Sequence, residues 1–178
     1  MKPAAAILIL LLISGSAAAP AVARDEPPLD GRGRAVRDDL LDRLAGKWDL
    51  TRKIRGKTAR NSVDAEWVLD HQFLEVHMRD VATPPEYELK LFIGYDNASE
   101  RYVAHWIDVF GGRFSETLGF GRRDGNSIRF VFEYPDGPFH NTFTWDEAAS
   151  GWTCLLEQKN GAGQWAVFAE DTLRRPGK

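Results

Sequence analysis

Apolar and polar residues alternate along most of the chain after residue 46. Residues 72–81 carry Leu74, Val76 and Met78 on one parity and charged or polar side chains on the other. The same period of two recurs in residues 48–54, 63–69, 87–95, 114–120, 128–134, 139–145, 152–156 and 165–173. Residues 101–110 are apolar on both parities. Because successive side chains of a strand point to opposite faces, the pattern predicts about ten β-strands.

Turn signals separate these runs at short spacing. They are Pro84-Pro85, Asp96-Asn97, Gly111-Gly112, Asp124-Gly125-Asn126, the segment 135–138 (PDGP) and Asn160-Gly161. Strands joined by tight turns are antiparallel neighbours, and a sheet with this many strands in chain order normally closes on itself. We therefore predict an all-β fold, an antiparallel up-and-down barrel of about ten strands, with a β-sandwich as the alternative.

One short helix is expected before the strands. Between residues 36 and 44 the apolar positions follow helical spacing, and Gly46 comes just after them as a stop signal. Residues 24–35 mix proline, glycine and charge, which is the composition of a flexible linker. The predicted barrel domain therefore covers residues 36–175.

The first 23 residues differ in kind from the rest. Lys2 precedes an apolar run over residues 4–13, and small residues follow up to Ala21-Val22-Ala23. This order is typical of a secretory signal peptide. The apolar run is too short to cross a bilayer core of about 30 Å. We expect an exported bacterial protein, periplasmic or secreted, with no stable membrane insertion after cleavage. The alternative is an uncleaved membrane anchor.

Composition narrows the classes of function. The net charge is −3, and without a basic block the chain is a poor candidate for a nucleic-acid partner. Cys154 is the single cysteine, which excludes a disulfide scaffold and favours a buried thiol. The 10 Phe, 6 Trp and 4 Tyr all follow residue 23. So many rings either fill a ten-stranded barrel or line a pocket in it.

The first strand opens on Gly46-Lys47-Trp48, directly after the short helix. This Gly-x-Trp segment resembles the opening motif of the lipocalin-like (calycin) barrels. The resemblance implies that Trp48 packs across one barrel end against an arginine near the end of the last strand, and Arg174 stands there. A guanidinium over an indole face would close that end by a cation–π contact.

Three further segments extend the resemblance. They are Phe73-Leu74-Glu75, Gly94-Tyr95-Asp96-Asn97 and Trp106-Ile107-Asp108. With Tyr102-Val103, they resemble an exported bacterial family of lipocalin-like domains of unknown function, over most of residues 44–175. The resemblance implies the barrel but no particular chemistry.

Our main hypothesis is a binding module whose interior holds a small apolar or amphipathic ligand. The expected lining residues are His105, Trp106, Phe130, Phe132, Phe143 and Trp165. One alternative is a structural or interaction domain of the cell envelope. Asp108 is a candidate buried acid, and Asp96 is expected to be a turn residue that makes an Asx hydrogen bond. The two are not paired at a spacing typical of general acid–base catalysis, and no nucleophile motif is present. We therefore expect a protein that is not an enzyme.

The histidines give a second alternative, a haem- or metal-binding barrel. His105 would face the interior if its parity points inward, and it could then ligate haem iron. Haem-binding barrels of the nitrobindin type share the Gly-x-Trp opening, but they take a histidine from a strand near the C-terminus. Here the last histidine is His140. His71, Glu75 and His77 share one parity and could bind a divalent ion, although that parity is the polar one. We predict no cofactor and no metal site.

Overall fold

The computed structural model describes residues 35–177. The predicted signal peptide (1–23) and residues 24–34 of the predicted linker lie outside the described residues. The helices are α1 (Asp39–Leu44) and α2 (Gly112–Ser115). The strands are β1 (Gly46–Ile54), β2 (Lys57–Val68), β3 (Phe73–Asp80), β4 (Glu88–Asp96), β5 (Arg101–Asp108), β6 (Leu118–Asp124), β7 (Ser127–Tyr134), β8 (Gly137–Asp146), β9 (Gly151–Lys159) and β10 (Trp165–Arg174).

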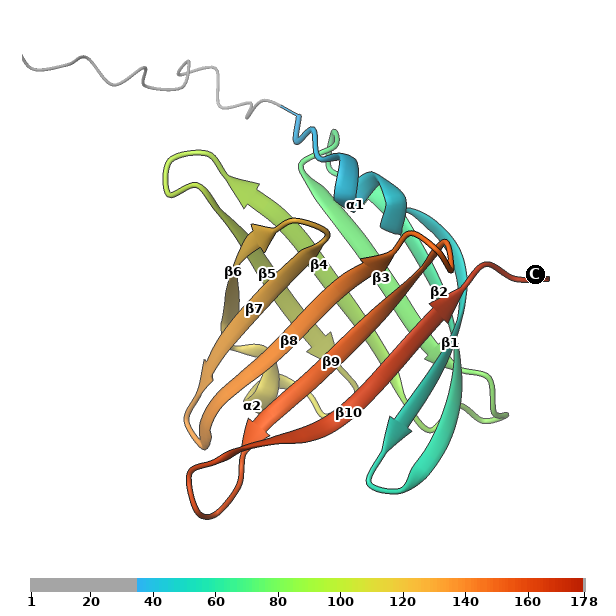
Figure 1. Ribbon diagram of the computed structural model, residues 1–178, viewed down its shortest axis with the longest axis vertical. Helices are drawn as coiled ribbons and strands as arrows, with labels where there is room; N and C mark the ends of the chain where they lie inside the picture. The colour runs from blue at the N-terminus through green and yellow to red at the C-terminus, as the bar shows by residue number, and fades with distance from the viewer. Residues whose placement is uncertain (1–34, 178) are drawn as a thin grey trace, which may run out of the picture. The chain divides into compact units, whose positions relative to one another are not determined.

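The ten strands form one closed antiparallel barrel (Figure 1). Each strand pairs with its neighbours in the chain, and β1 pairs with both β2 and β10, which closes the sheet. The predicted all-β up-and-down barrel is confirmed, and the sandwich alternative is wrong. The structure adds α2, a single turn between β5 and β6 that the sequence pattern did not indicate. Neither helix within residues 35–177 is long and apolar enough to cross a membrane.

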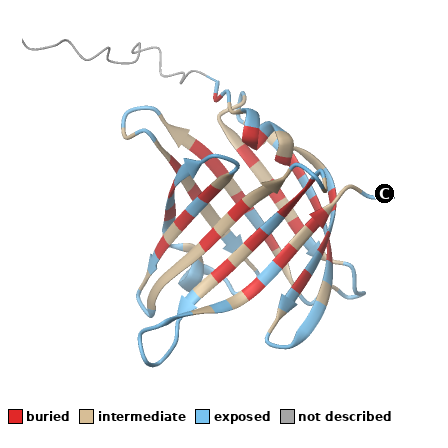
Figure 2. Ribbon diagram, viewed as in Figure 1, coloured by how far each residue is buried: buried red, intermediate tan, exposed pale blue. Residues whose placement is uncertain are grey.

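Buried and exposed residues alternate along the strands, because successive side chains point into and out of the barrel (Figure 2). In β1, Trp48 and Leu50 are buried while Lys47 and Asp49 are exposed. β5 turns Tyr102, Ala104 and Trp106 inward, as their burial and contacts show. The core therefore lies inside the barrel and is built by one parity of each strand.

In β10 the alternation is interrupted by a change of register between Val167 and Ala169. The extra residue of this β-bulge lets two residues of the same parity face opposite sides. Val167 is exposed, whereas Ala169 is buried. Phe168, at the bulge, packs against the core instead. The bulge therefore decides which aromatic side chain of the last strand enters the barrel.

Helix α1 covers the end of the barrel at which β1 begins. The Asp38 carboxylate accepts hydrogen bonds from the backbone N–H groups of Leu40 and Leu41, an N-cap that starts the helix. Leu40, Leu41 and Leu44 are at most 1 % exposed. The helix is thus held by its apolar face and not by its length, since six residues alone would not stay helical.

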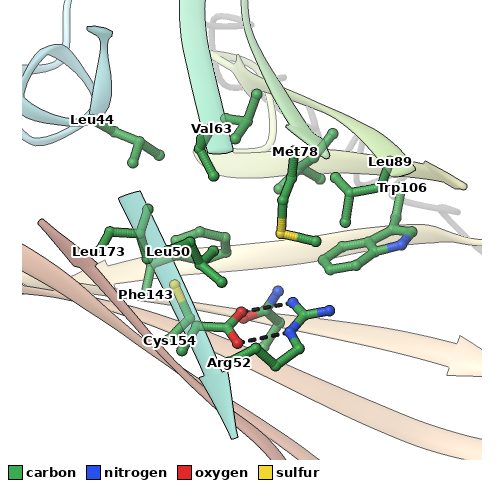
Figure 3. Close-up of a pocket in the computed structure, with 14 residues that line it drawn as sticks. Leu44, Leu50, Arg52, Val63, Met78, Leu89, Trp106, Phe143, Cys154 and Leu173 are labelled. Carbon is green, nitrogen blue, oxygen red and sulfur yellow. Dashed lines mark hydrogen bonds and ion pairs between the residues drawn. The ribbon is translucent and has the colours of Figure 1, made fainter. Parts of the chain in front are cut away.

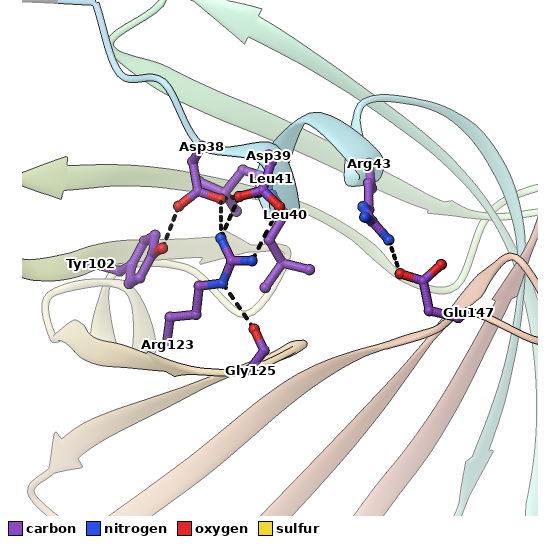
Figure 4. A network of polar contacts seen from close by, with 9 residues as sticks. All are labelled: Asp38, Asp39, Leu40, Leu41, Arg43, Tyr102, Arg123, Gly125 and Glu147. Atoms are coloured by element: carbon purple, nitrogen blue, oxygen red, sulfur yellow. Dashed lines mark hydrogen bonds and ion pairs between the residues drawn. The ribbon is translucent and has the colours of Figure 1, made fainter.

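Ion pairs and hydrogen bonds fix α1 to the strands (Figure 4). The Tyr102 hydroxyl donates to the Asp38 carboxylate. Arg123 of β6 lies 2.6 Å from Oδ1 of Asp39. Arg43 pairs with Glu147 of the β8–β9 turn. These contacts come from β5, β6 and the β8–β9 turn, so the helix is tied to the barrel on several sides.

Candidate functional site

Trp48 and Arg175 close the end of the barrel beneath α1. The Arg175 guanidinium carbon lies 3.6 Å from the centre of the Trp48 ring. Its nitrogens donate to the carbonyl oxygens of residues 43, 45 and 47. The expected partner was Arg174, but the Arg174 side chain donates to the carbonyl of Leu173 and lies against Gly151 instead. The contact expected from the sequence is therefore present, one residue further along.

Gly46 makes this contact possible. A Cβ atom at residue 46 would lie 2.5 Å from Nη1 of Arg175, and the backbone there has a φ of +107°. A larger residue would meet both the guanidinium and the backbone strain of positive φ. The glycine of the Gly-x-Trp segment is therefore explained by the arginine that lies across it.

Two more tryptophans complete the closed end. Trp145 packs edge to face against Trp48 at 6.4 Å and against Trp152 at 5.6 Å between ring centres. Trp48 Nε1 donates to the carbonyl of Leu44 in α1 at 2.7 Å. Trp48 and Trp152 are at most 1 % exposed. The rings and α1 together leave this end packed.

The opposite end holds a cavity of about 650 Å³. Arg52 and Ile54 line it from β1. Further lining residues come from other strands of the barrel and from the turns at this end, such as Asp136 between β7 and β8. Four rings form a continuous row along one side: centre-to-centre distances are 5.7 Å for Phe132 and Tyr134, 6.2 Å for Tyr134 and Phe139, and 5.5 Å for Phe139 and Phe168. Phe114 of α2 adds to the lining. One side of the cavity is thus walled by aromatic rings.

Arg52 of the cavity lining forms an ion pair with Asp171 in the barrel interior; Figure 3 shows this pair beside a smaller void that both residues line. Nε and Nη2 of Arg52 donate to the two carboxylate oxygens at 2.7 and 2.6 Å. Both side chains are more than nine-tenths buried. Burial alone would lower the pKa of Arg52, but the hydrogen bond and charge of Asp171 more than offset it and leave that pKa raised. The guanidinium of Arg52 therefore stays charged.

Beneath the ion pair is a small inner void of about 30 Å³, the size of one or two water molecules. Arg52 and Trp106 line both this void and the large cavity. Asn141, which is 2 % exposed, lines the void, and its Oδ1 has no hydrogen-bond partner among the described residues. Cys154 also lines it, and burial raises the pKa of its thiol. The predicted burial of Cys154 is confirmed.

Asp108 carries a carboxylate on the cavity wall. Its Oδ2 accepts from the hydroxyl of Tyr87 at 2.9 Å and from Nε1 of Trp106 at 3.1 Å, and its Oδ1 accepts from the N–H of Phe110 at 3.0 Å. Burial, followed by the charge of Asp108, raises the pKa of Tyr87, and the same two causes raise the pKa of Tyr134 to about 12. Both phenols are therefore neutral hydrogen-bonding groups at neutral pH.

Asn61 is a second polar group on this wall. It lies in β2 opposite Asp80 of β3, and both residues line the cavity. Asn61 is 4 % exposed. Its side-chain amide makes no hydrogen bond among the described residues. The Asn61 side chain therefore offers polar atoms to the cavity.

Of the six predicted lining residues, Trp106 and Phe132 line the large cavity. Phe143 lines the inner void. Phe130 is 1 % exposed and packs in the core between Tyr102 and Phe143. Trp165 is 40 % exposed, and it stacks on His140 at 3.7 Å on the outer face of the barrel.

None of the four histidines lines the cavity. His105 alternates with the inward Trp106, and its Nε2 lies 2.6 Å from the carbonyl of Ser115 in α2. His140 has a lowered pKa because of burial and the charge of Arg129.

The three residues considered for a divalent ion have separate partners. His71 lies in the turn before β3 and stacks on Trp67 at 4.0 Å. Glu75 pairs with Lys90, and His77 bonds to Glu88. Within residues 35–177 no group of three or more His, Cys, Asp or Glu side chains could hold a metal ion.

The polar residues of the interior were missed from the sequence. Arg52 shares the parity of Trp48 and Leu50, and Asp171 shares that of Ala169 and Leu173, so each is a charged residue on an apolar face. Asn61 likewise shares the parity of Val63 and Ala65. A polar residue that breaks an otherwise apolar parity was the available signal.

Comparison with curated proteins gives no match for this chain. A family model described as "Protein of unknown function (DUF1579)" matches residues 37–175, which includes all ten strands. Because this match covers most of the chain and the whole barrel, the protein belongs to the DUF1579 family, whose function is unknown.

Proposed function

We propose that the protein is an exported lipocalin-like barrel that binds one small amphipathic ligand in the open cavity, without catalysing a reaction on it. The observation that carries this proposal is the cavity of about 650 Å³ at the end opposite α1. Ligand pockets typically have volumes of about 300–1,000 Å³ and combine mostly apolar walls with a few polar groups that converge on the ligand.

The lining agrees with an amphipathic ligand. Phe132, Phe139 and Phe168 offer apolar surface on one side. Asn61 and Asp108 offer hydrogen-bonding atoms on another. Rings left partly uncovered inside a barrel lose dispersion contacts and stay in contact with water, so a bound apolar body would stabilise them. The haem and metal alternatives lack such support, because no histidine lines the cavity.

Titration with the neutral fluorophore N-phenyl-1-naphthylamine tests the proposal. We expect saturable binding of one probe per barrel, with enhanced fluorescence. Ala59 lines the cavity, so Ala59→Trp would place an indole in the space that the probe needs. Thr58 is exposed on the opposite face of β2, which makes Thr58→Trp the matched control.

Both variants should unfold in the same denaturant range as the unsubstituted chain. We expect Ala59→Trp to lose at least about tenfold in affinity and Thr58→Trp to keep it. Equal affinity in all three proteins, or binding of several probes without saturation, would mean that the probe binds the surface, and the proposal would be wrong.

A further inference from the structure

The cavity wall has an apolar half and a polar half. The apolar half comes from β7–β10, with the row of rings formed by Phe132, Tyr134, Phe139 and Phe168. The polar half comes from β1–β5. Its polar residues are Arg52, Asn61, Asp80, Tyr87 and Asp108. A ligand in this cavity therefore meets apolar surface on one side and hydrogen-bonding groups on the other.

The charges of the polar half do not cancel. Arg52 is neutralised by its two hydrogen bonds to Asp171. Asp108 accepts hydrogen bonds only from neutral groups and has no ion-pair partner among the described residues. Asp80 likewise accepts only from the N–H groups of Ala82 and Glu86. The uncompensated charge on this wall is therefore negative.

Other charged residues of the lining lie in the turns at the rim. Asp136 pairs with Arg113 at 3.4 Å. Arg55 belongs to the β1–β2 turn and lies 5.4 Å from the Phe168 ring. Lys159 ends β9 and lies 5.6 Å from the ring of Trp165, on the outer face. Glu86 precedes β4 and adds one more carboxylate to the rim. None of the cations forms an ion pair with Asp108.

Two aromatic side chains donate hydrogen bonds to the Asp108 carboxylate. Tyr87 and Trp106 donate to it, and Tyr87 packs against Phe110 at 5.8 Å between ring centres. These two side chains turn their hydroxyl and N–H edges to the carboxylate, and the guanidinium carbon of Arg52 lies 5.7 Å from the centre of the Tyr87 ring. Asn61 lines the same cavity from β2, with β3 and β4 between it and the β5 strand that carries Asp108. An ammonium group donates hydrogen bonds, and the Asp108 carboxylate is an acceptor on this wall with no ion-pair partner among the described residues.

We infer that the ligand carries an ammonium head group, which binds at the Asp108 carboxylate, and an apolar body that lies along the row of rings. This inference rests on the proposed function, because it names the chemical class of the ligand that the cavity would hold. The ammonium would donate a charge-assisted hydrogen bond to the carboxylate, a stronger interaction than one between neutral groups.

Displacement of N-phenyl-1-naphthylamine by decylamine, decanoate and decan-1-ol tests the inference. The three competitors share one alkyl chain and differ in head group, so the apolar contribution cancels in the comparison. At pH 7 we expect decylamine to displace the probe at concentrations about tenfold below those of decanoate, with the alcohol in between. A decanoate that competes as well as decylamine or better would overturn the inference.

Asp108→Asn removes the charge at nearly constant shape. We expect it to bring decylamine to the level of decan-1-ol. The affinity of the variant for the probe is measured first, so that the three displacement curves share one reference. Asp124→Asn is the matched control, because it removes the same charge from an exposed carboxylate at the end of β6. The neighbouring Arg123 pairs with Asp39 of α1, so this end of β6 lies at the α1 end of the barrel, away from the cavity. An Asp108→Asn variant that binds the probe and keeps the full preference for decylamine would contradict the inference.

The outcomes separate the two proposals. If the probe does not bind the unsubstituted chain, the proposed function is wrong, and the inference falls with it. If the probe binds but the head group has no effect, only the inference is wrong. If Asp108→Asn does not fold, the ranking of the three competitors on the unsubstituted chain still decides the question.

Discussion

At the end of the barrel covered by α1, the rings of Trp48, Trp145 and Trp152 pack edge to face beneath the helix. At the opposite end, the rings of Phe132, Phe139 and Phe168 line a cavity of about 650 Å³. Both ends are rich in aromatic residues. The first is covered by α1, whose three leucines are buried, and by Arg175 over Trp48, whereas at the second the single turn of α2 only adds Phe114 to the cavity lining. Aromatic content alone therefore does not distinguish a packed core from a pocket; the covering segments do.

Removing one indole from each end should have the most unequal effect. Trp48→Ala deletes a ring that is 1 % exposed and leaves the Leu44 carbonyl without its donor, so we expect a loss of about 4 kcal/mol in the free energy of unfolding. Trp165→Ala deletes a ring that is 40 % exposed, and we expect a loss below about 1 kcal/mol. Urea unfolding measures both, and similar losses would contradict the contrast between the two sites.

The ion pair between the two regions should respond cooperatively. Arg52→Met leaves the buried Asp171 carboxylate without a partner, and we expect a loss of about 3 kcal/mol. Asp171→Leu should lower the free energy of unfolding by a similar amount, because it leaves the buried Arg52 guanidinium without a partner. The double variant should recover most of the loss, because it leaves no buried charge unpaired. Losses that simply add in the double variant would contradict the account of the pair.

The two adjacent arginines at the end of β10 give a smaller, matched comparison. Arg175→Ala removes the cation–π contact with Trp48 and hydrogen bonds to three carbonyl groups, so we expect a loss of about 2 kcal/mol. Arg174→Ala removes one hydrogen bond to the Leu173 carbonyl, and the loss should be less than half as large. Thermal unfolding measures both losses. A larger loss in Arg174→Ala than in Arg175→Ala would mean that Arg174, and not Arg175, closes this end of the barrel.

The last expected effect is a change of stability that is confined to alkaline pH. Tyrosine has a pKa of about 10 in an unfolded chain, and the pKa of Tyr134 in the barrel is about 12, so the folded state retains the proton over this interval. The unfolded state loses it first, and the free energy of unfolding falls as pH rises above about 10. Tyr134→Phe should fall less steeply than the unsubstituted chain. An unchanged slope would show that Tyr134 does not contribute.

The barrel was predictable because each strand repeats the same alternation over several residues. The end that α1 closes was also largely predictable, since Gly46 and Trp48 stand together next to a helical pattern. The arginine was misplaced by one residue, because Arg174 and Arg175 are adjacent and only the side-chain directions separate them.

The cavity was harder to predict, because it depends on details that alternation does not encode. Trp165 was expected inside, but the bulge between Val167 and Ala169 changes the face of the strand and brings Phe168 to the cavity. His105 was a candidate because its strand is apolar on both parities, so the pattern did not show which parity faces inward. In the structure Trp106 faces inward, and His105 faces outward and contacts the Ser115 carbonyl of α2. The turn that forms α2 has no periodic signal of its own.

The contrast between the two ends is tested most directly by the indole N–H signals in a two-dimensional ¹H–¹⁵N spectrum, assigned by single Trp→Phe substitutions. Trp106 lines the cavity, whereas Trp48, Trp145 and Trp152 pack at the closed end. On addition of N-phenyl-1-naphthylamine, we predict that the Trp106 signal shifts with saturation and that the other three stay in place. Shifts at Trp48, Trp145 or Trp152 without a shift at Trp106 would contradict the account.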